Sequence, residues 1–580
     1  MPGALLPRVL MAVWCLAATL TALSVLQAGT LDVAGMRVSL RNPSRPFLVL
    51  AAISLLLVHL RPSRATRLQD AMQRIVSTVP EWCVALAVAS LALVVGCRFG
   101  SDVAAGADSY GYVTHAEMLA TGQLRRPESP MAAAATWPNG RRSLAPLGWL
   151  PAEPGLLAPV YPPGYPLLMA AARVIHPMAM FAIVPLAGAV ALVAVLVLAR
   201  AIGRSDLGVP AALLLASSPA FLMSLVVPMS DLPATAAWAV ATVLALGRNR
   251  WSVVGAGATG GLALLIRPNL LPVSIGILVL SATGGSDTRQ RVVRLLIVST
   301  GLAVGAALVA AFQWSYYGSP TANGYGRMSD LFAIGHAWTN VRQFTRWLFE
   351  THPMVVLASA AVGAVWTVRQ HATPASRLWL LPALSAACYA LYLPFGYWTY
   401  LRFLLPAFPV AMLWAAIGIR HVAGHFREPL ATYAFALTIG WCVLAGVHEA
   451  RVRSVFTNTA SLERFRSVSI GVARILPPRS VVITREFSGS LPYYGHVDTL
   501  RWDWLDAPAL AAAVAALQSQ RRAVFALLDL DSEAPEFERH YPSGTSLRLE
   551  SIRTFAGTAE RIALYRVIDG ASAAVAVSPP

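Results

Sequence analysis

Two aspartates stand at the ends of apolar runs, where a charged side chain is costly. Asp108 lies in Gly-Ala-Asp-Ser-Tyr-Gly-Tyr (106–112), and Asp231 lies in Ser-Asp-Leu-Pro-Ala (230–234). An ionised carboxylate in hydrocarbon costs about 2.5 to 3.5 kcal/mol on insertion scales, so it needs a partner or a wet cavity. Carboxylates held at a membrane surface predict chemistry on a lipid-linked substrate.

Other segments supply side chains suited to a phosphate-bearing ligand. Arg267 in Ile-Arg-Pro-Asn and Arg402 in Tyr-Leu-Arg-Phe both stand at the ends of apolar runs. The planar guanidinium matches phosphate oxygens, and burial does not remove its charge. We predict that Glu117, together with Tyr161 and Tyr165 of Tyr-Pro-Pro-Gly-Tyr-Pro, lines the same substrate groove.

Each of these residues also has a plainer interpretation. Asp108 is placed to cap a helix predicted over 109–121, and Asp231, followed by Pro233, fits a helix start. Arginines at span ends commonly reach lipid headgroups, and tyrosines commonly anchor at the interface. The spacing of His115 and Glu117 places them on different helix faces, so a shared metal site is a weak prediction. No metal ligands are assigned, although a divalent metal is possible because a phosphate can be neutralised by either arginines or a metal.

The composition indicates which kind of protein must position these residues. Of 580 residues, 56% are hydrophobic and only 13% are charged, which excludes an ordinary soluble globule. The formal net charge of +17 comes from arginines that fall mostly in short loops between apolar runs. Arginines in such loops set membrane topology or meet lipid headgroups, so nucleic acid is not an expected partner and membrane lipids are.

Apolar runs predict about thirteen transmembrane helices, several of them short against the roughly 20 residues of a full crossing. Arginine-rich short loops fall on one side if the N-terminus is cytoplasmic, with 37–45 as the one discordant loop. The long segments 100–176 and 314–352 and the tail after 448 are then extracytoplasmic. The predicted spans are 9–27, 46–60, 82–97, 178–199, 209–227, 232–246, 251–266, 270–280, 295–312, 353–368, 378–394, 403–419 and 431–447.

The tail differs in character from the rest of the chain. It carries charges throughout, with helix-like stretches at 461–475 and 507–518 and strand-like stretches at 480–483, 523–530 and 561–567. This pattern predicts a small extracytoplasmic α/β domain. The expected domains are N-terminal spans 1–99, an outer loop 100–176 with the candidate catalytic aspartate, a transmembrane core 177–448 and the outer domain 449–580.

The order of these motifs resembles bacterial GT-C glycosyltransferases, most of all the protein O-mannosyltransferase and aminoarabinose transferase branch. The resemblance runs from about 100 to 419 and rests on the order of the motifs. In that family the acidic loop follows the first span, whereas here it follows the third, so two extra N-terminal spans are implied. The motifs are GADSY at 106–110, YPPGYP at 161–166, SPAF at 218–221, SDLPA at 230–234, IRPN at 266–269, YGSPTANGYG at 317–326 and RFLLPAFP at 402–409.

The resemblance implies a polytopic, mainly α GT-C-like enzyme that moves a sugar from a polyprenyl-phosphate donor to an acceptor in the cell envelope. Asp108 is then the candidate base for the acceptor hydroxyl, Asp231 a second catalytic carboxylate, and Arg267 and Arg402 bind the leaving phosphate. A base facing the acceptor while the phosphate leaves from the opposite side gives inversion. The expected location is the bacterial inner membrane.

Two other classes of protein remain open from the sequence. A lipid or solute transporter is also polytopic, but its polar residues belong near the bilayer midplane with repeat symmetry between halves. A noncatalytic envelope assembly protein would use its outer loops and tail only for binding. The sequence identifies neither the sugar nor the acceptor.

Overall fold

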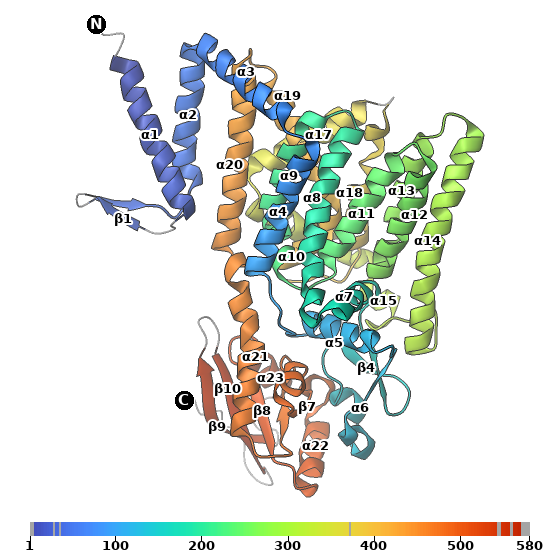
Figure 1. Cartoon of the computed structure of the whole chain (residues 1–580). Coiled ribbons are helices and arrows are strands. Elements are labelled where there is room, and N and C mark those ends of the chain that lie inside the picture. Colours follow the sequence, from blue (N-terminus) through green and yellow to red (C-terminus); the bar gives the residue numbers. More distant parts are fainter. Residues whose placement is uncertain are drawn as a thin grey trace.

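The computed structural model is mainly helical, with long helices side by side and a sheet at one end (Figure 1). The apolar helices make the chain a multi-pass membrane protein. The structure describes residues 5–26, 30–33, 36–370, 373–541, 547–556 and 561–569.

Two N-terminal helices and a hairpin stand beside the main bundle, and α2 packs against α20 (Leu430–Val452) of that bundle (Figure 1). Helix α3 then runs across the end of the bundle, bent by 110° from α2, and leads into α4. These elements are α1 (Leu5–Leu26), β1 (Thr30–Val33), β2 (Met36–Ser39), α2 (Ser44–Leu60), α3 (Pro62–Thr78) and α4 (Glu81–Phe99).

The segment after α4 is folded on the same side of the bundle as the C-terminal sheet (Figure 1). It consists of two helices that pack on each other, α5 and α7, with a short helix and three short strands between them. Their bounds are α5 (Asp108–Ala120), β3 (Arg126–Pro127), α6 (Gly140–Ser143), β4 (Trp149–Pro151), β5 (Leu156–Pro159) and α7 (Gly164–Ile175).

The main bundle follows. Its helices are α8 (Ile183–Ala201), α9 (Gly208–Ser217), α10 (Pro219–Val226), α11 (Asp231–Leu246), α12 (Arg250–Ile266), α13 (Val273–Thr283), α14 (Thr288–Tyr317), α15 (Met328–Leu331), α16 (Ala337–Thr351), α17 (Met354–Arg369), α18 (Leu380–Ala390), α19 (Phe408–Ala423) and α20 (Leu430–Val452).

The predicted number of thirteen spans is not confirmed. Among the described residues, five helices are long and apolar enough to cross a membrane, or up to eight if each bent pair forms one span. Several apolar runs are divided or end early: Pro219 separates α9 from α10 with a bend of 64°, and α11, α12 and α13 are shorter than a full crossing.

Small residues allow α12 to lie directly against α14. A Cβ on Gly261 would come within 2.4 Å of the Gly301 carbonyl oxygen, and one on Gly257 within 3.0 Å of the Val298 carbonyl oxygen. Paired small residues four positions apart are the usual basis of close helix packing in membranes. This contact holds the end of α12, where Arg267 follows Ile266.

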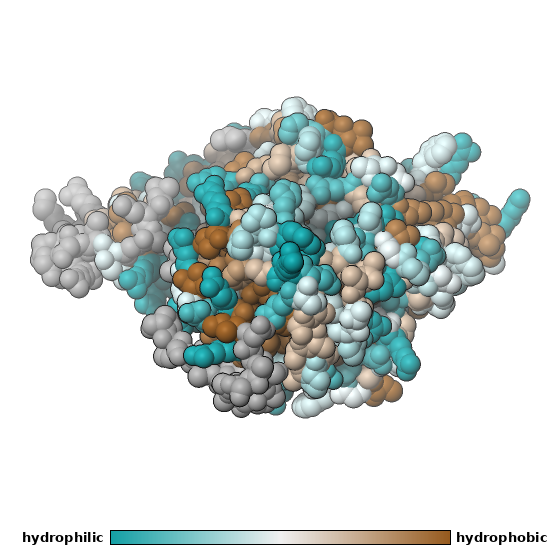
Figure 2. All heavy atoms as spheres, turned by 90° about the horizontal axis from the view of Figure 1, so that it is seen from below, coloured by the Kyte–Doolittle hydropathy of each residue, from teal (hydrophilic) through white to brown (hydrophobic). Residues whose placement is uncertain are grey.

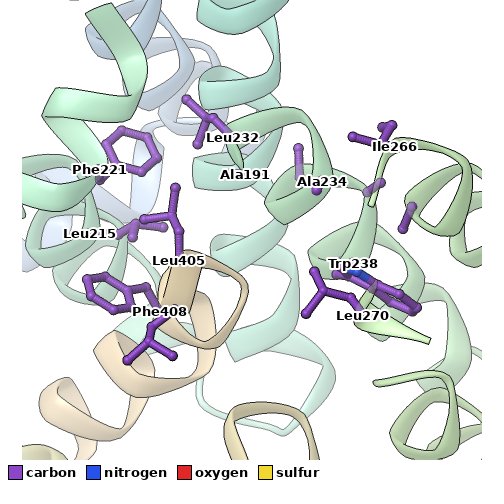
Figure 3. Close-up of a cluster of buried hydrophobic side chains, with 14 of the residues drawn as sticks. Ala191, Leu215, Phe221, Leu232, Ala234, Trp238, Ile266, Leu270, Leu405 and Phe408 are labelled. Atoms are coloured by element: carbon purple, nitrogen blue, oxygen red, sulfur yellow. The ribbon is translucent and has the colours of Figure 1, made fainter. Parts of the chain in front are cut away.

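The bundle core fixes the backbone beside the charged candidates. Figure 3 shows the apolar side chains that meet between the helices, including Leu232, Ile266 and Leu405, each at most 1% exposed. Leu232 follows Asp231, and Ile266 precedes Arg267. Apolar packing therefore fixes the backbone positions of Asp231 and Arg267.

The C-terminal residues form a five-stranded sheet in the order β7-β6-β8-β10-β9. Strand β6 pairs in parallel with β7 and β8, whereas β10 is antiparallel to β8 and β9. Strands β6, β8 and β10 and helices α21 and α22 fall where the sequence predicts them. The elements are α21 (Asn458–Ile475), β6 (Val481–Ile483), β7 (Asp498–Leu500), α22 (Ala507–Ser519), β8 (Val524–Asp529), α23 (Ala534–His540), β9 (Leu547–Ala556) and β10 (Arg561–Asp569).

The face of the molecule that carries this sheet mixes hydrophilic and apolar side chains, as Figure 2 shows. The sheet itself is held by an apolar core that includes Val481, Leu500 and Ala526.

The C-terminal domain also buries a carboxyl group. Glu533 is fully buried, and its Oε1 accepts hydrogen bonds from the Trp502 indole and the Arg485 backbone N–H. Burial raises the pKa of Glu533 to about 7.

We expect this burial to make the protein's stability depend on pH. The folded protein retains the Glu533 proton between about pH 4.5 and pH 7, whereas the unfolded chain releases it, so the unfolding free energy falls as pH rises through that window. Glu533→Gln should remove this part of the slope. Melting temperatures of both proteins at pH 5 and pH 8 test the prediction, and an unchanged difference between the two pH values in the variant contradicts it.

Candidate active site

Asp108 is the first residue of α5, and its carboxylate faces the bundle. The Tyr161 hydroxyl donates to Oδ1 at 2.7 Å, and Arg402 Nη2 donates to Oδ2 at 3.0 Å. Both carboxylate oxygens therefore bond to side chains from other segments, contacts that a helix cap does not require. Its side chain is 32% exposed, which leaves it accessible to a ligand.

Asp231 is the first residue of α11, and it is almost completely buried at 1% side-chain exposure. Its Oδ1 lies 2.7 Å from Arg267 Nη2, and its Oδ2 lies 3.6 Å from Arg402 Nε. No side-chain cap is present at this helix start. The predicted helix start is confirmed, but the Asp231 carboxylate faces the Arg267 and Arg402 guanidinium groups and balances their charge.

Both arginines are turned into the protein. Arg267 donates from Nη1 to the Tyr389 hydroxyl at 2.8 Å and from Nε to Ser230 Oγ at 3.2 Å. Arg402 lies in the 3₁₀ segment Trp398–Ala407. The guanidinium carbons of Arg267 and Arg402 both lie over the Phe403 ring, 5.4 and 5.6 Å from its centroid. These contacts exclude the interpretation that the two side chains simply reach out to headgroups.

Asp108, Asp231, Arg267 and Arg402 thus form one connected group, which we call the charged cluster. Two carboxylates and two guanidinium groups give it no net formal charge, which makes its burial tolerable. Its members come from four separate parts of the chain. The more exposed carboxylate, Asp108, stands at its open end, and the more buried one, Asp231, stands behind the arginines.

The two predicted tyrosines are placed differently around the charged cluster. Tyr161 touches it directly through Asp108, whereas the Tyr165 ring is fully buried and packs edge-on against Tyr112 at 5.0 Å. The Tyr325 ring, 5.9 Å from Tyr161, adds an exposed aromatic side chain from the loop after α14. Tyr165 therefore supports the wall of the site rather than its surface.

Sequence reasoning missed Tyr112 and Tyr389. The Tyr112 hydroxyl pairs with Ser230 Oγ at 2.8 Å, and the Tyr389 hydroxyl accepts from Arg267. Tyr112 had a usable signal, because it lies four residues after Asp108 and so on the same face of α5. Tyr389 had none, since a tyrosine inside an apolar run looks like any core residue.

Glu117 is not brought to the charged cluster. Nine residues separate it from Asp108 on α5, which corresponds to two and a half turns and the opposite face of the helix. Its Oε1 accepts from the Tyr493 hydroxyl at 2.9 Å and lies 3.4 Å from Arg173 Nη2. Glu117 therefore joins α5 to the C-terminal domain and to α7.

His115 likewise lies outside the charged cluster, with its ring against Tyr316 and Trp149. It is fully buried, with Nε2 2.9 Å from the Tyr316 hydroxyl, and burial lowers the pKa of His115 to about 3. A neutral imidazole in such a place is structural. Within the described part of the chain, no three His, Cys, Asp or Glu side chains gather as metal ligands.

Comparison with known proteins gives structural likenesses only. No protein-family model and no curated protein matches the chain. ArnT from Cupriavidus metallidurans, solved with bound undecaprenyl phosphate, is 12% identical over 84% of this chain and 98% of its own, with a TM-score of 0.47.

Two further solved structures are similar to the same extent. The Archaeoglobus fulgidus oligosaccharyltransferase is 13% identical over 83% of this chain and 73% of its own, with a TM-score of 0.46. The mycobacterial arabinofuranosyltransferase AftD is 12% identical over 85% of this chain and 40% of its own, with a TM-score of 0.47. All three are GT-C glycosyltransferases, the class that the motifs resemble. At these identities and scores, no residue role or activity is carried over from them.

Proposed function

We propose that this protein is an inverting glycosyltransferase that moves a sugar from a polyprenyl-phosphate donor to an acceptor hydroxyl at the membrane surface. The observation that carries the proposal is the charged cluster, in which an accessible carboxylate and two buried arginines adjoin. Such a transfer needs a base for the acceptor and cations for the departing phosphate. The cluster offers both within one ion-paired network.

The roles divide by exposure. Asp108 is the proposed base, since it is the carboxylate that a ligand can reach. Asp231 is the proposed positioning residue, because its carboxylate holds both guanidinium groups and is itself closed off. Tyr161, which donates to Asp108 Oδ1, keeps the carboxylate oriented.

The reaction is a single displacement. The acceptor hydroxyl gives its proton to Asp108 while its oxygen forms a bond to the sugar's anomeric carbon. The bond from that carbon to the phosphate oxygen breaks, and its electron pair stays on the phosphate. In the free protein, Arg402 Nη2 donates a hydrogen bond to Asp108 Oδ2. When the donor binds, Arg402 donates to the phosphate instead, which frees Asp108 to take up the proton.

The topology is part of the proposal. Arginine placement supports a cytoplasmic N-terminus and a bacterial inner-membrane location, with residues 100–176 and 449–580 on the outer side. The segments 1–99, 100–176, 177–448 and 449–580 are the proposed domains. The acceptor is then a molecule of the cell envelope.

The test is release of polyprenyl phosphate by the purified protein in liposomes, offered a panel of polyprenyl-phosphate sugars and envelope extract as acceptor. Release that requires one particular sugar supports the proposal and identifies the donor. If no donor gives release, the transporter and envelope-assembly alternatives are favoured.

Arg402→Ala is expected to weaken donor use in the same assay. Losing charge-assisted hydrogen bonds of about 1.5 to 3 kcal/mol should raise the KM for the donor by about 10- to 150-fold and also lower the rate. Arg289→Ala, which changes an exposed arginine on α14, is the matched control and should leave both unchanged. Unaltered donor KM in Arg402→Ala rules out the phosphate assignment.

A further inference from the structure

An apolar groove lies between α4 and α20, which stand side by side in Figure 1. Its volume is about 500 Å³, and α8, α9 and α10 form its floor. Val95 and Phe99 line it from α4, and Val443 and Val447 line it from α20. None of the four residues of the charged cluster borders this groove, so it is a separate feature of the molecule.

The depth of the groove matches one leaflet of a bilayer. Along α20 it extends from Val443 to Arg451, eight residues or about 12 Å of helix. The hydrocarbon core is about 30 Å thick, so one leaflet accounts for about 15 Å. A single acyl chain running parallel to α20 fits this depth, whereas a long polyprenyl chain exceeds it.

The mouth of the groove is cationic. Arg451 lines it, and Arg98 stands over the Phe99 ring at 5.3 Å, while Phe99 in turn contacts the Phe456 ring at 5.0 Å. Both arginines are exposed, and in the described part of the chain neither has a carboxylate partner. The neighbouring Glu449 is already paired with Arg453 at 2.7 Å.

Arg451 is nevertheless held in place. Its Nη2 donates to the Val25 carbonyl oxygen of α1 at 3.1 Å, which leaves its other N–H groups free. The mouth lies on the side of the membrane that carries Asp108 and the C-terminal sheet, because α4 leads into α5 and α20 leads into α21. The apolar groove therefore opens at the same membrane surface as two arginines that have no carboxylate partner in the described part of the chain.

We propose that this groove binds one anionic glycerophospholipid, with an acyl chain between α4 and α20 and the phosphate head group between Arg98 and Arg451. The cations at the mouth select for a net negative head group, and the apolar walls accept the chain. The lipid would seal the seam between the main bundle and the N-terminal pair α1 and α2. This site does not depend on the proposed sugar transfer.

Native mass spectrometry of the purified full-length protein tests the proposal. The protein is offered equal amounts of dipalmitoyl phosphatidylglycerol and dipalmitoyl phosphatidylethanolamine. We expect the wild-type protein to retain one phosphatidylglycerol molecule. In the double variant Arg98→Gln/Arg451→Gln, the ratio of bound phosphatidylglycerol to bound phosphatidylethanolamine should fall by about 30-fold, as expected for the loss of two arginines near a net negative head group. Arg369→Gln, an exposed arginine at the end of α17, should keep the preference.

A second variant fills the groove. Ala216→Trp on the groove floor should abolish retention of both lipids, whereas Leu86→Trp, on the exposed face of α4 outside the groove, should not. Size-exclusion chromatography and melting temperature verify that each variant is folded. If Ala216→Trp does not fold, the double variant Arg98→Gln/Arg451→Gln alone tests the proposal. Equal lipid preference in wild type and the arginine double variant overturns the proposal, as does preferential retention of an added polyprenyl phosphate.

Discussion

Asp108→Asn should reduce sugar transfer by about two to four orders of magnitude while leaving the protein folded in the membrane. The change is nearly isosteric but removes the negative charge and with it the capacity to accept a proton, and general-base catalysis typically contributes about that much. Because Asp108 is one-third exposed, losing its ion pair with Arg402 should cost less stability than losing the buried carboxylate of Asp231. The measurement is the rate of polyprenyl phosphate release with saturating donor and acceptor.

Asp102→Asn is the matched control. Asp102 lies six residues upstream in the same segment and pairs with Arg466 at 3.1 Å, so its loss also breaks one partly exposed ion pair. It should leave transfer unchanged. Wild-type turnover in Asp108→Asn would falsify the assignment of the base.

Asp231→Asn should have the opposite profile, with the main loss in stability. Removing one partner of a buried ion pair typically costs 3 to 5 kcal/mol, and here it leaves two guanidinium groups facing each other without their shared anion. We expect the unfolding free energy in detergent to fall by about this amount. Asp330→Asn, an exposed aspartate in α15, is the control.

The contrast between the two aspartates separates their proposed roles. If Asp231→Asn unfolds at the same temperature as wild type, then Asp231 does not hold the arginines. If it is as stable as wild type but inactive, Asp231 belongs to the chemistry rather than to positioning. Donor KM should rise in Asp231→Asn because Arg267 and Arg402 lose the anion that orients them.

Much of the charged cluster was predictable because its members carry strong local signals. A charged residue at the end of an apolar run is costly, so Asp108, Asp231, Arg267 and Arg402 stand out in the sequence. The structure brings all four together with Tyr161, although their roles in catalysis remain predictions. Sequence alone could not show that the four residues meet, because that depends on how α5, α11, α12 and the 3₁₀ segment before α19 pack.

What was missed has equally specific reasons. Glu117 was predicted to line the groove beside Asp108, but their nine-residue separation puts them on opposite faces of α5. In the tail, β7 was missed because only one of its three residues is apolar, whereas all three residues of β6 are. The predicted thirteen spans are not confirmed, because several of the apolar helices in the described part of the chain, among them α11, α12 and α13, are shorter than a full crossing.

The order of the charged cluster along the chain has a consequence for biosynthesis. Asp108, Asp231 and Arg267 are made first and together carry one uncompensated negative charge. Arg402 follows 135 residues after Arg267 (402 − 267), which at about 5 to 20 residues per second is a delay of roughly seven to twenty-seven seconds. Until Arg402 emerges, the nascent chain therefore lacks the cation that pairs with Asp108 in the folded protein.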